Sequence, residues 1–93
     1  MLSEVPIDLG KVGKRELNRE ILRVGLIAEL DAINLYEQMA AMTEDERIRK
    51  VLLDIAKEEK THVGEFLALL LKLDEEQGKE LERGRKEVEE LTE

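Results

Sequence analysis

The sequence predicts an all-α fold in which two long helices form an antiparallel hairpin and a short helix follows. The composition is the first indication, because 42% hydrophobic and 41% charged residues with only 2% aromatic residues are typical of long helices. The second indication is that apolar residues recur at steps of three and four along two stretches. Since only a short polar segment near Thr43 separates these stretches, the two helices are expected to lie side by side and antiparallel.

The first stretch predicts a helix at 14–42, preceded by an extended arm at 1–13. The arm contains Pro6, Gly10 and Gly13 and shows no helical period. Other faces of the helix are also apolar, so more than one neighbour is expected to cover it. Steps of three and four select one row of its side chains, the 22–40 row, which consists of Leu22, Leu26, Glu29, Ile33, Tyr36 and Ala40.

The second stretch predicts a helix at 44–73. Thr43 and Glu46 have the spacing of a capping box, with Thr43 as the N-cap. We expect one row of this helix to pack against a neighbouring helix, with a second apolar stripe of Val63, Leu67 and Leu70 beside it. This 48–73 row consists of Ile48, Leu52, Ile55, Glu59, His62, Phe66, Leu69 and Leu73.

The last part of the chain predicts a short, charged helix at about 79–92, after an interruption at Gly78. Leu81, Val88 and Leu91 are its apolar anchors. Because these are few, we expect this helix to lean on a neighbour or on another chain.

The whole chain, 1–93, is expected to form one small domain with a thin core. Cysteine is absent, so disulfides cannot support this core, whereas metal binding and association can. The net charge of -8 argues against nucleic acid as a partner, because its phosphates would be repelled, and it favours cations. The longest apolar run, Phe66 to Leu71, is far shorter than the roughly 18 residues that span a bilayer. No secretory leader opens the sequence, so we expect a cytoplasmic protein that does not enter a membrane.

Both apolar rows contain ionisable residues near their centres. Glu29 lies in the first row, and Glu59 and His62 lie one turn apart on one face of the second helix. A charge removed from water costs several kcal/mol unless it is paired or binds something. Counted from the turn, the three residues are at about equal distances, so an antiparallel hairpin places them at one level. They are candidate metal ligands, although His62 alone could be a hydrogen-bonded core residue and Glu29 alone could reach solvent.

One hairpin supplies too few donors to enclose a metal pair, and it is only half of a four-helix bundle. A two-fold symmetric dimer would close the bundle and double the ligands. The doubled set is a Glu from each of two helices and a Glu-x-x-His from each of the other two, as in di-iron carboxylate bundles. These donors suit iron, manganese or zinc, in a pair of ions about 3.5 to 4 Å apart. We expect metal to stabilise the dimer and acid to release it.

The pairs Glu29 with Tyr36 and Glu59 with His62 resemble the two helix motifs of ferritin-like proteins. Over roughly Arg15 to Leu91, the chain resembles the encapsulated ferritins, which are half-ferritins housed in encapsulin nanocompartments. The resemblance implies that Glu29, Glu59 and His62 are ligands of a di-iron site shared by two chains and that Tyr36 lies beside the metals. It also implies a ring of dimers, typically a decamer, and a ferroxidase that oxidises ferrous ion with dioxygen and supplies iron for storage inside the shell.

The chain also departs from the pattern of that family. Asp31 stands where the family has one of the acids that help metal to enter, but Ala28 and Leu35 occupy neighbouring places of this kind. We therefore expect the uptake route to be reduced or moved. The segment Glu87–Glu93 shows no Gly and Leu rich shell-targeting tail. The protein was truncated, or its domain is fused to the shell protein, or it is not cargo.

Two other functions compete with iron oxidation. The first is a structural assembly module, in which metal staples an oligomer together without turnover. The second is a peroxide-reducing enzyme of the rubrerythrin type. The absence of cysteine argues against the second, because the usual rubredoxin-like electron donor domain needs cysteine ligands.

Overall fold

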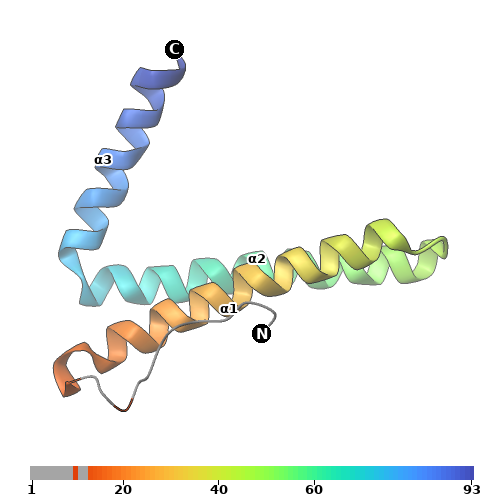
Figure 1. The fold of residues 1–93 in the computed structure, drawn as a ribbon, viewed down its shortest axis with the longest axis horizontal. Helices are drawn as coiled ribbons and strands as arrows, with labels where there is room; N and C mark the ends of the chain where they lie inside the picture. The colour runs from red at the N-terminus through yellow and green to blue at the C-terminus, as the bar shows by residue number, and fades with distance from the viewer. Residues whose placement is uncertain (1–9, 11–12) are drawn as a thin grey trace.

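The computed structural model describes residue 10 and residues 13–93, which form three helices (Figure 1). Helices α1 (Lys14–Met42) and α2 (Glu46–Leu73) run antiparallel, side by side, and α3 (Glu75–Thr92) turns away from the end of α2. The predicted all-α fold with a two-helix hairpin and a third helix is confirmed. Most of the predicted arm at 1–13 lies outside the described residues.

The N-cap of α2 is Asp45, so the predicted cap at Thr43 and the predicted start at residue 44 are wrong. The Asp45 carboxylate accepts hydrogen bonds from the backbone N–H groups of Arg47 at 2.8 Å and Ile48 at 3.3 Å. Thr43 instead accepts a hydrogen bond from the Asp45 backbone N–H at 3.2 Å. A full negative charge at the first turn is favoured by the helix dipole, which explains why the aspartate prevails over the threonine.

Arg49 ties the turn between α1 and α2 to both helices. Its guanidinium donates to the backbone carbonyl of Ala40 at 3.1 Å, to the carbonyl of Thr43 and to the Glu46 carboxylate. The last carbonyls of a helix have no partner within that helix. Arg49 therefore satisfies carbonyls that the end of α1 leaves open, and it holds the two helices in register.

The helix boundary that we predicted at Gly78 lies at Asp74, and α3 begins at Glu75 rather than at residue 79. The Asp74 carboxylate caps α3 by accepting from the Gln77 N–H at 3.1 Å, and it also accepts from the Arg23 guanidinium at 2.9 Å. Gly78 lies within the helix. A mid-helix glycine costs only about 1 kcal/mol, so the N-cap, not the glycine, sets the boundary.

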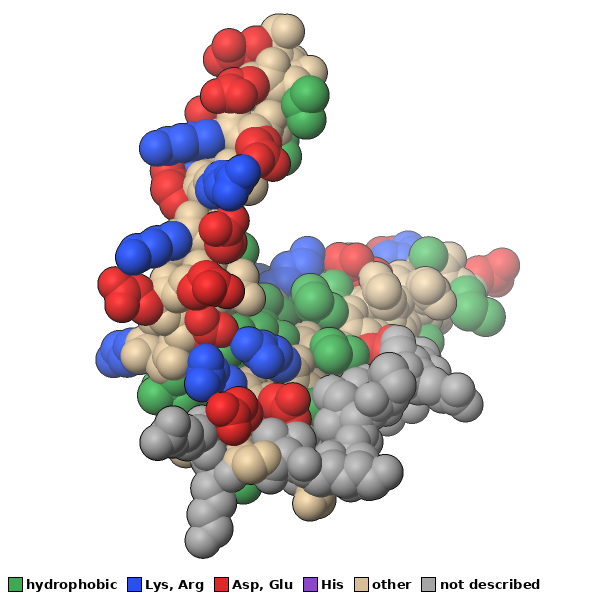
Figure 2. Space-filling model, turned by 60° about the vertical axis from the view of Figure 1, so that its left-hand side comes forward, with side chains coloured by type: hydrophobic (Ala, Val, Ile, Leu, Met, Phe, Trp, Pro, Cys, Tyr) green, Lys and Arg blue, Asp and Glu red, His purple; other side chains and the backbone are tan. Residues whose placement is uncertain are grey.

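Charged side chains crowd the projecting α3 (Figure 2). Arg85 pairs with Glu82 and Glu89, and Arg83 pairs with Glu87 at 3.4 Å, which are the pairings expected one turn apart on a helix. The three predicted apolar anchors of this helix are exposed in the single chain, including Leu81, which lines a groove at the α1–α2 hairpin. The leaning of α3 on another chain stays a prediction.

The core between α1 and α2 is thin. The buried hydrophobic side chains in the described part of the chain come from both helices, and they are Leu22, Ile33, Ala40, Ala56 and Leu70. Leu22, Ile33 and Ala40 of the 22–40 row therefore lie between the helices. Of the 48–73 row, however, Ile48, Leu69 and Leu73 are about half exposed. The adjacent stripe with Ala56 and Leu70 packs against α1, because α2 is apolar on two sides. The ends of the 48–73 row are therefore open, whereas its middle, with His62 and Phe66, is partly buried beside α1.

The Arg47 side chain and the first N–H groups of α2 lower the pKa of Asp45. The stabilisation by this cap is therefore present above the ordinary pKa of about 3.9 and is lost as pH falls through the lowered value. We predict that Asp45→Ala lowers the Tm at pH 7 more than Thr43→Ala does, and that the gap between wild type and Asp45→Ala narrows below about pH 3.9. Thermal melts followed by circular dichroism test this. A larger decrease in Tm for Thr43→Ala than for Asp45→Ala would instead support the capping box with Thr43 as the N-cap.

Candidate metal centre

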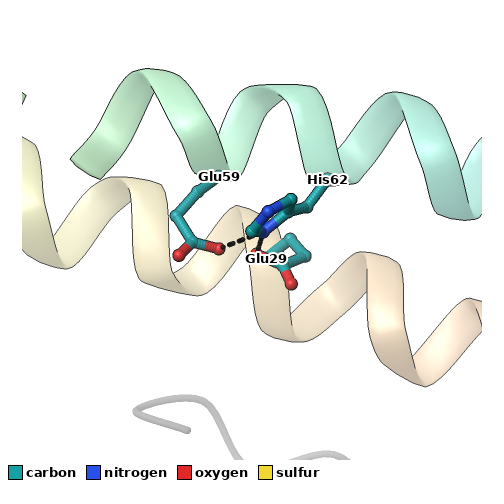
Figure 3. Close-up of side chains that lie close together, drawn as sticks. All are labelled: Glu29, Glu59 and His62. Carbon is teal, nitrogen blue, oxygen red and sulfur yellow. Dashed lines mark hydrogen bonds and ion pairs between the residues drawn. The ribbon is translucent and has the colours of Figure 1, made fainter. Parts of the chain in front are cut away.

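Glu29, Glu59 and His62 meet in space, with Glu29 on α1 and the other two on α2 (Figure 3). Nδ1 of His62 lies 3.3 Å from Oε2 of Glu59 and 3.5 Å from Oε2 of Glu29. One donor atom from each residue lies within 4.8 Å of the others. Within the described residues, no other group of three acids or histidines comes as close together. These three residues are called the donor trio below.

The hairpin brings the donor trio together for the reason that the sequence suggested. Glu59 and His62 are separated by one turn, so their side chains share a face of α2. The antiparallel arrangement puts Glu29 of α1 at the same height. Lys60, next to Glu59 on α2, forms an ion pair at 3.1 Å with Glu37 of α1, about two turns after Glu29. This pair lies outside the donor trio, and because both side chains are exposed it contributes little to stability.

One oxygen of the Glu29 carboxylate lacks a hydrogen bond. Its Oε2 atom is buried and makes no hydrogen bond, because the 3.5 Å contact with His62 is an ion-pair distance and not a hydrogen bond. The Glu29 and Glu59 side chains are only 18% and 19% exposed. Two partly desolvated carboxylates beside one imidazole repel each other unless a proton or a cation intervenes. Carboxylate oxygens and an imidazole nitrogen are the donors that iron, manganese and zinc accept, so the donor trio fits such a cation.

Glu29 and His62 of the donor trio line an open hollow of about 420 Å³, together with Glu65, Phe66 and Leu69. His62 is the most accessible member of the trio, with 44% of its side chain exposed. The site therefore opens toward the edge of the hairpin and is not sealed in its interior. Glu65 is a lining residue that the sequence reasoning missed. Its position one turn after His62 was the available signal.

Tyr36 and Asp31 are both half-buried on α1. Asp31 is not a member of the group of donors described above. Tyr36 follows Glu29 by two turns and precedes Glu37, the partner of Lys60. The roles that the sequence suggested for these two residues stay predictions.

Comparison with known proteins places the chain in a family. Its sequence matches the EncFtn-like family over residues 8–85. The chain belongs to the EncFtn-like family. The resemblance to encapsulated ferritins that the sequence indicated is thereby confirmed. The EncFtn-like chain is also similar to the crystal structure of the encapsulated ferritin domain from Pyrococcus furiosus, with 61% identity and a TM-score of 0.85 over 99% of this chain and 96% of that one.

Two relatives of the EncFtn-like chain are longer proteins. A ferritin-like-encapsulin shell fusion protein of Pyrococcus furiosus is 62% identical over 94 residues, which cover 99% of this chain and 27% of the relative. The encapsulin nanocompartment cargo protein EncC of Myxococcus xanthus is 40% identical over 67 residues, which cover 72% of this chain and 51% of the relative. The chain thus spans about a quarter of one relative and half of the other. Among the described residues, no helix has an apolar stretch long enough to cross a bilayer.

We predict that Glu29→Gln weakens the binding of Mn²⁺ by about tenfold or more, because it removes the charge of a donor and keeps its shape. Isothermal titration calorimetry measures the affinity. Glu37→Gln is the matched control, because Glu37 is a carboxylate of the same helix that pairs with Lys60 outside the donor trio. An unchanged affinity in Glu29→Gln would show that the trio does not hold the ion.

Proposed function

We propose that this EncFtn-like chain is a ferroxidase that oxidises Fe(II) to Fe(III) with dioxygen at a di-iron site between two copies of the chain. The main support for this proposal is the environment of the Glu29 carboxylate. A buried carboxylate oxygen of Glu29 has no hydrogen bond and points into a set of two carboxylates and one imidazole at an open edge of the hairpin. Such an arrangement is costly unless a cation occupies it, and membership of the EncFtn-like family favours iron as that cation.

The shape of the single chain supports association into a dimer. Its radius of gyration is 16.4 Å, whereas a compact domain of this length has a radius of about 12 Å. Its accessible surface is 7414 Å², against about 5500 Å² for a compact monomer of this mass. Ile48, Leu69 and Leu73 at the ends of the 48–73 row are exposed, and so is nearly half of the His62 side chain. Pairing of two hairpins through the face with these side chains covers the apolar residues and closes a four-helix bundle with the full di-iron ligand set.

In the proposed site iron is the substrate, and each Fe(II) gives one electron to dioxygen. Glu29 and Glu59 supply anionic oxygen donors, and His62 supplies a neutral nitrogen. The attraction between a carboxylate and a cation rises with the charge of the cation, so these side chains favour Fe(III) over Fe(II) and promote the loss of the electron. Tyr36 lies beside the metals in this proposal, and Asp31 helps ferrous ion to enter.

The relatives support a place within an encapsulin shell. One relative is named as a fusion of a ferritin-like protein with an encapsulin shell, and the other as an encapsulin nanocompartment cargo protein. We propose that dimers of this chain assemble into a ring, a decamer as in the resemblance, and deliver ferric ion to the interior of such a shell. The high identity to the fusion protein favours the arrangement in which the domain is joined to the shell protein.

The alternative is a structural module in which the metal staples two hairpins together without turnover. The thin core of the single chain favours a need for such a staple. Both proposals require metal at the donor trio, and they differ in whether ferrous ion is oxidised there.

We predict that the protein oxidises ferrous ion in air faster than buffer does, and that Glu29→Ala and His62→Ala each lower the rate by about tenfold or more, because each removes a donor. The appearance of ferric product, followed by absorbance, measures the rate. Glu37→Ala serves as the control and should keep the wild-type rate. Equal rates in wild type and in both donor variants would contradict ferroxidase activity and would favour the structural module without turnover.

A further inference from the structure

Gly25 lies within α1 at a point where the ring of Phe66 from α2 rests directly on the helix backbone. A Cβ atom built at Gly25 would lie 2.6, 2.8 and 2.9 Å from three carbons of that ring. Carbon atoms pack at about 3.5 to 4.0 Å, so no larger residue fits here without displacing the ring. Glycine lowers the stability of a helix relative to alanine. The contact with Phe66 explains why a glycine stands at this place.

This contact between the helices lies beside the donor trio, on the side away from the turn. Gly25 precedes Glu29 by one turn of α1, and Phe66 follows His62 by one turn of α2, so each pair shares a helix face. Phe66 also lines the hollow of about 420 Å³ together with Glu29 and His62. A movement of the ring therefore changes the space around Glu29 and His62.

The donor trio depends on the distance between the helices for one of its members. Glu59 and His62 both come from α2, so their 3.3 Å contact does not depend on where α1 lies (Figure 3). Glu29 comes from α1, and its 3.5 Å contact with His62 crosses between the helices. In metal sites the metal–donor distances agree with their standard values to within about 0.2 Å. A change of the helix spacing therefore moves Glu29 out of range and leaves the other two donors in place.

We propose that Phe66, seated on Gly25, is a positioning residue of the metal centre that sets the spacing at which Glu29 reaches the two donors of α2. This inference rests on the proposed metal binding of the donor trio. Phe66 acts through Glu29 and His62 and does not itself bind the ion. An alanine at position 25 forces the ring into the hollow or the helices apart, and both movements disturb the donors.

The test uses Co²⁺ alone as the probe, because its visible absorption reports the number and arrangement of its ligands. We expect Gly25→Ala to bind Co²⁺ about tenfold or more weakly and to alter the spectrum. Gly64→Ala is the matched control, because no atom lies within 4 Å of the added Cβ although this residue also lies in a helix close to His62. Both variants raise helix propensity, and only Gly25→Ala should weaken Co²⁺ binding.

A rescue experiment separates positioning from a general loss of structure. In Gly25→Ala/Phe66→Leu the shorter side chain makes room for the added methyl group, so the double variant should bind Co²⁺ as well as Phe66→Leu does. Wild-type affinity and spectrum in Gly25→Ala would overturn the inference. If circular dichroism shows that Gly25→Ala does not fold, Co²⁺ binding by Phe66→Leu is the deciding measurement. A wild-type Co²⁺ spectrum and affinity in Phe66→Leu would overturn the inference. Failure of the wild type itself to bind Co²⁺ would overturn the proposed function as well.

Discussion

The contact of the His62 imidazole with the carboxylates of Glu29 and Glu59 is the interaction on which the rest of this structure depends. Two carboxylates held partly out of water repel each other. The single Nδ1 atom of His62 that faces them cannot donate a full hydrogen bond to both. The buried oxygen of Glu29 shows this imbalance directly, since it lacks a hydrogen bond. At one level of its hairpin the chain therefore holds two carboxylates whose repulsion a bound cation would reduce.

The surrounding features serve to keep the two helices at a constant height and spacing. At the turn, Arg49 binds carbonyls of the α1 end, and Asp45 caps α2, so the helices start in register. Beside the donor trio, the ring of Phe66 rests on Gly25 of α1. The remaining core is too thin to hold a 93-residue chain firmly. We propose that metal binding and association with a second copy add stability, and that the donor trio takes part in both.

The sequence was sufficient to predict the hairpin and the donor trio, because both follow from periodicity and from equal distances to the turn. It was not sufficient to locate the helix starts, because several neighbouring residues can act as the N-cap. Asp45, not Thr43, caps α2, and Asp74 rather than Gly78 sets the start of α3. The half-exposed state of Leu69 was missed because α2 has two apolar stripes, and periodicity does not tell which one faces α1. The fit of Phe66 on Gly25 is a matter of tenths of an ångström, which spacing along the chain cannot reveal.

The central claim is that the donor trio of one chain meets that of a second chain around iron. Crystals grown with ferrous ion under anaerobic conditions, with diffraction measured at the iron absorption edge, test it most directly. We expect two anomalous peaks per dimer about 3.5 to 4 Å apart, each bound by carboxylate and imidazole donors from Glu29, Glu59 and His62. A dimer that buries a different face, or a donor trio that faces solvent without any anomalous peak, would contradict it.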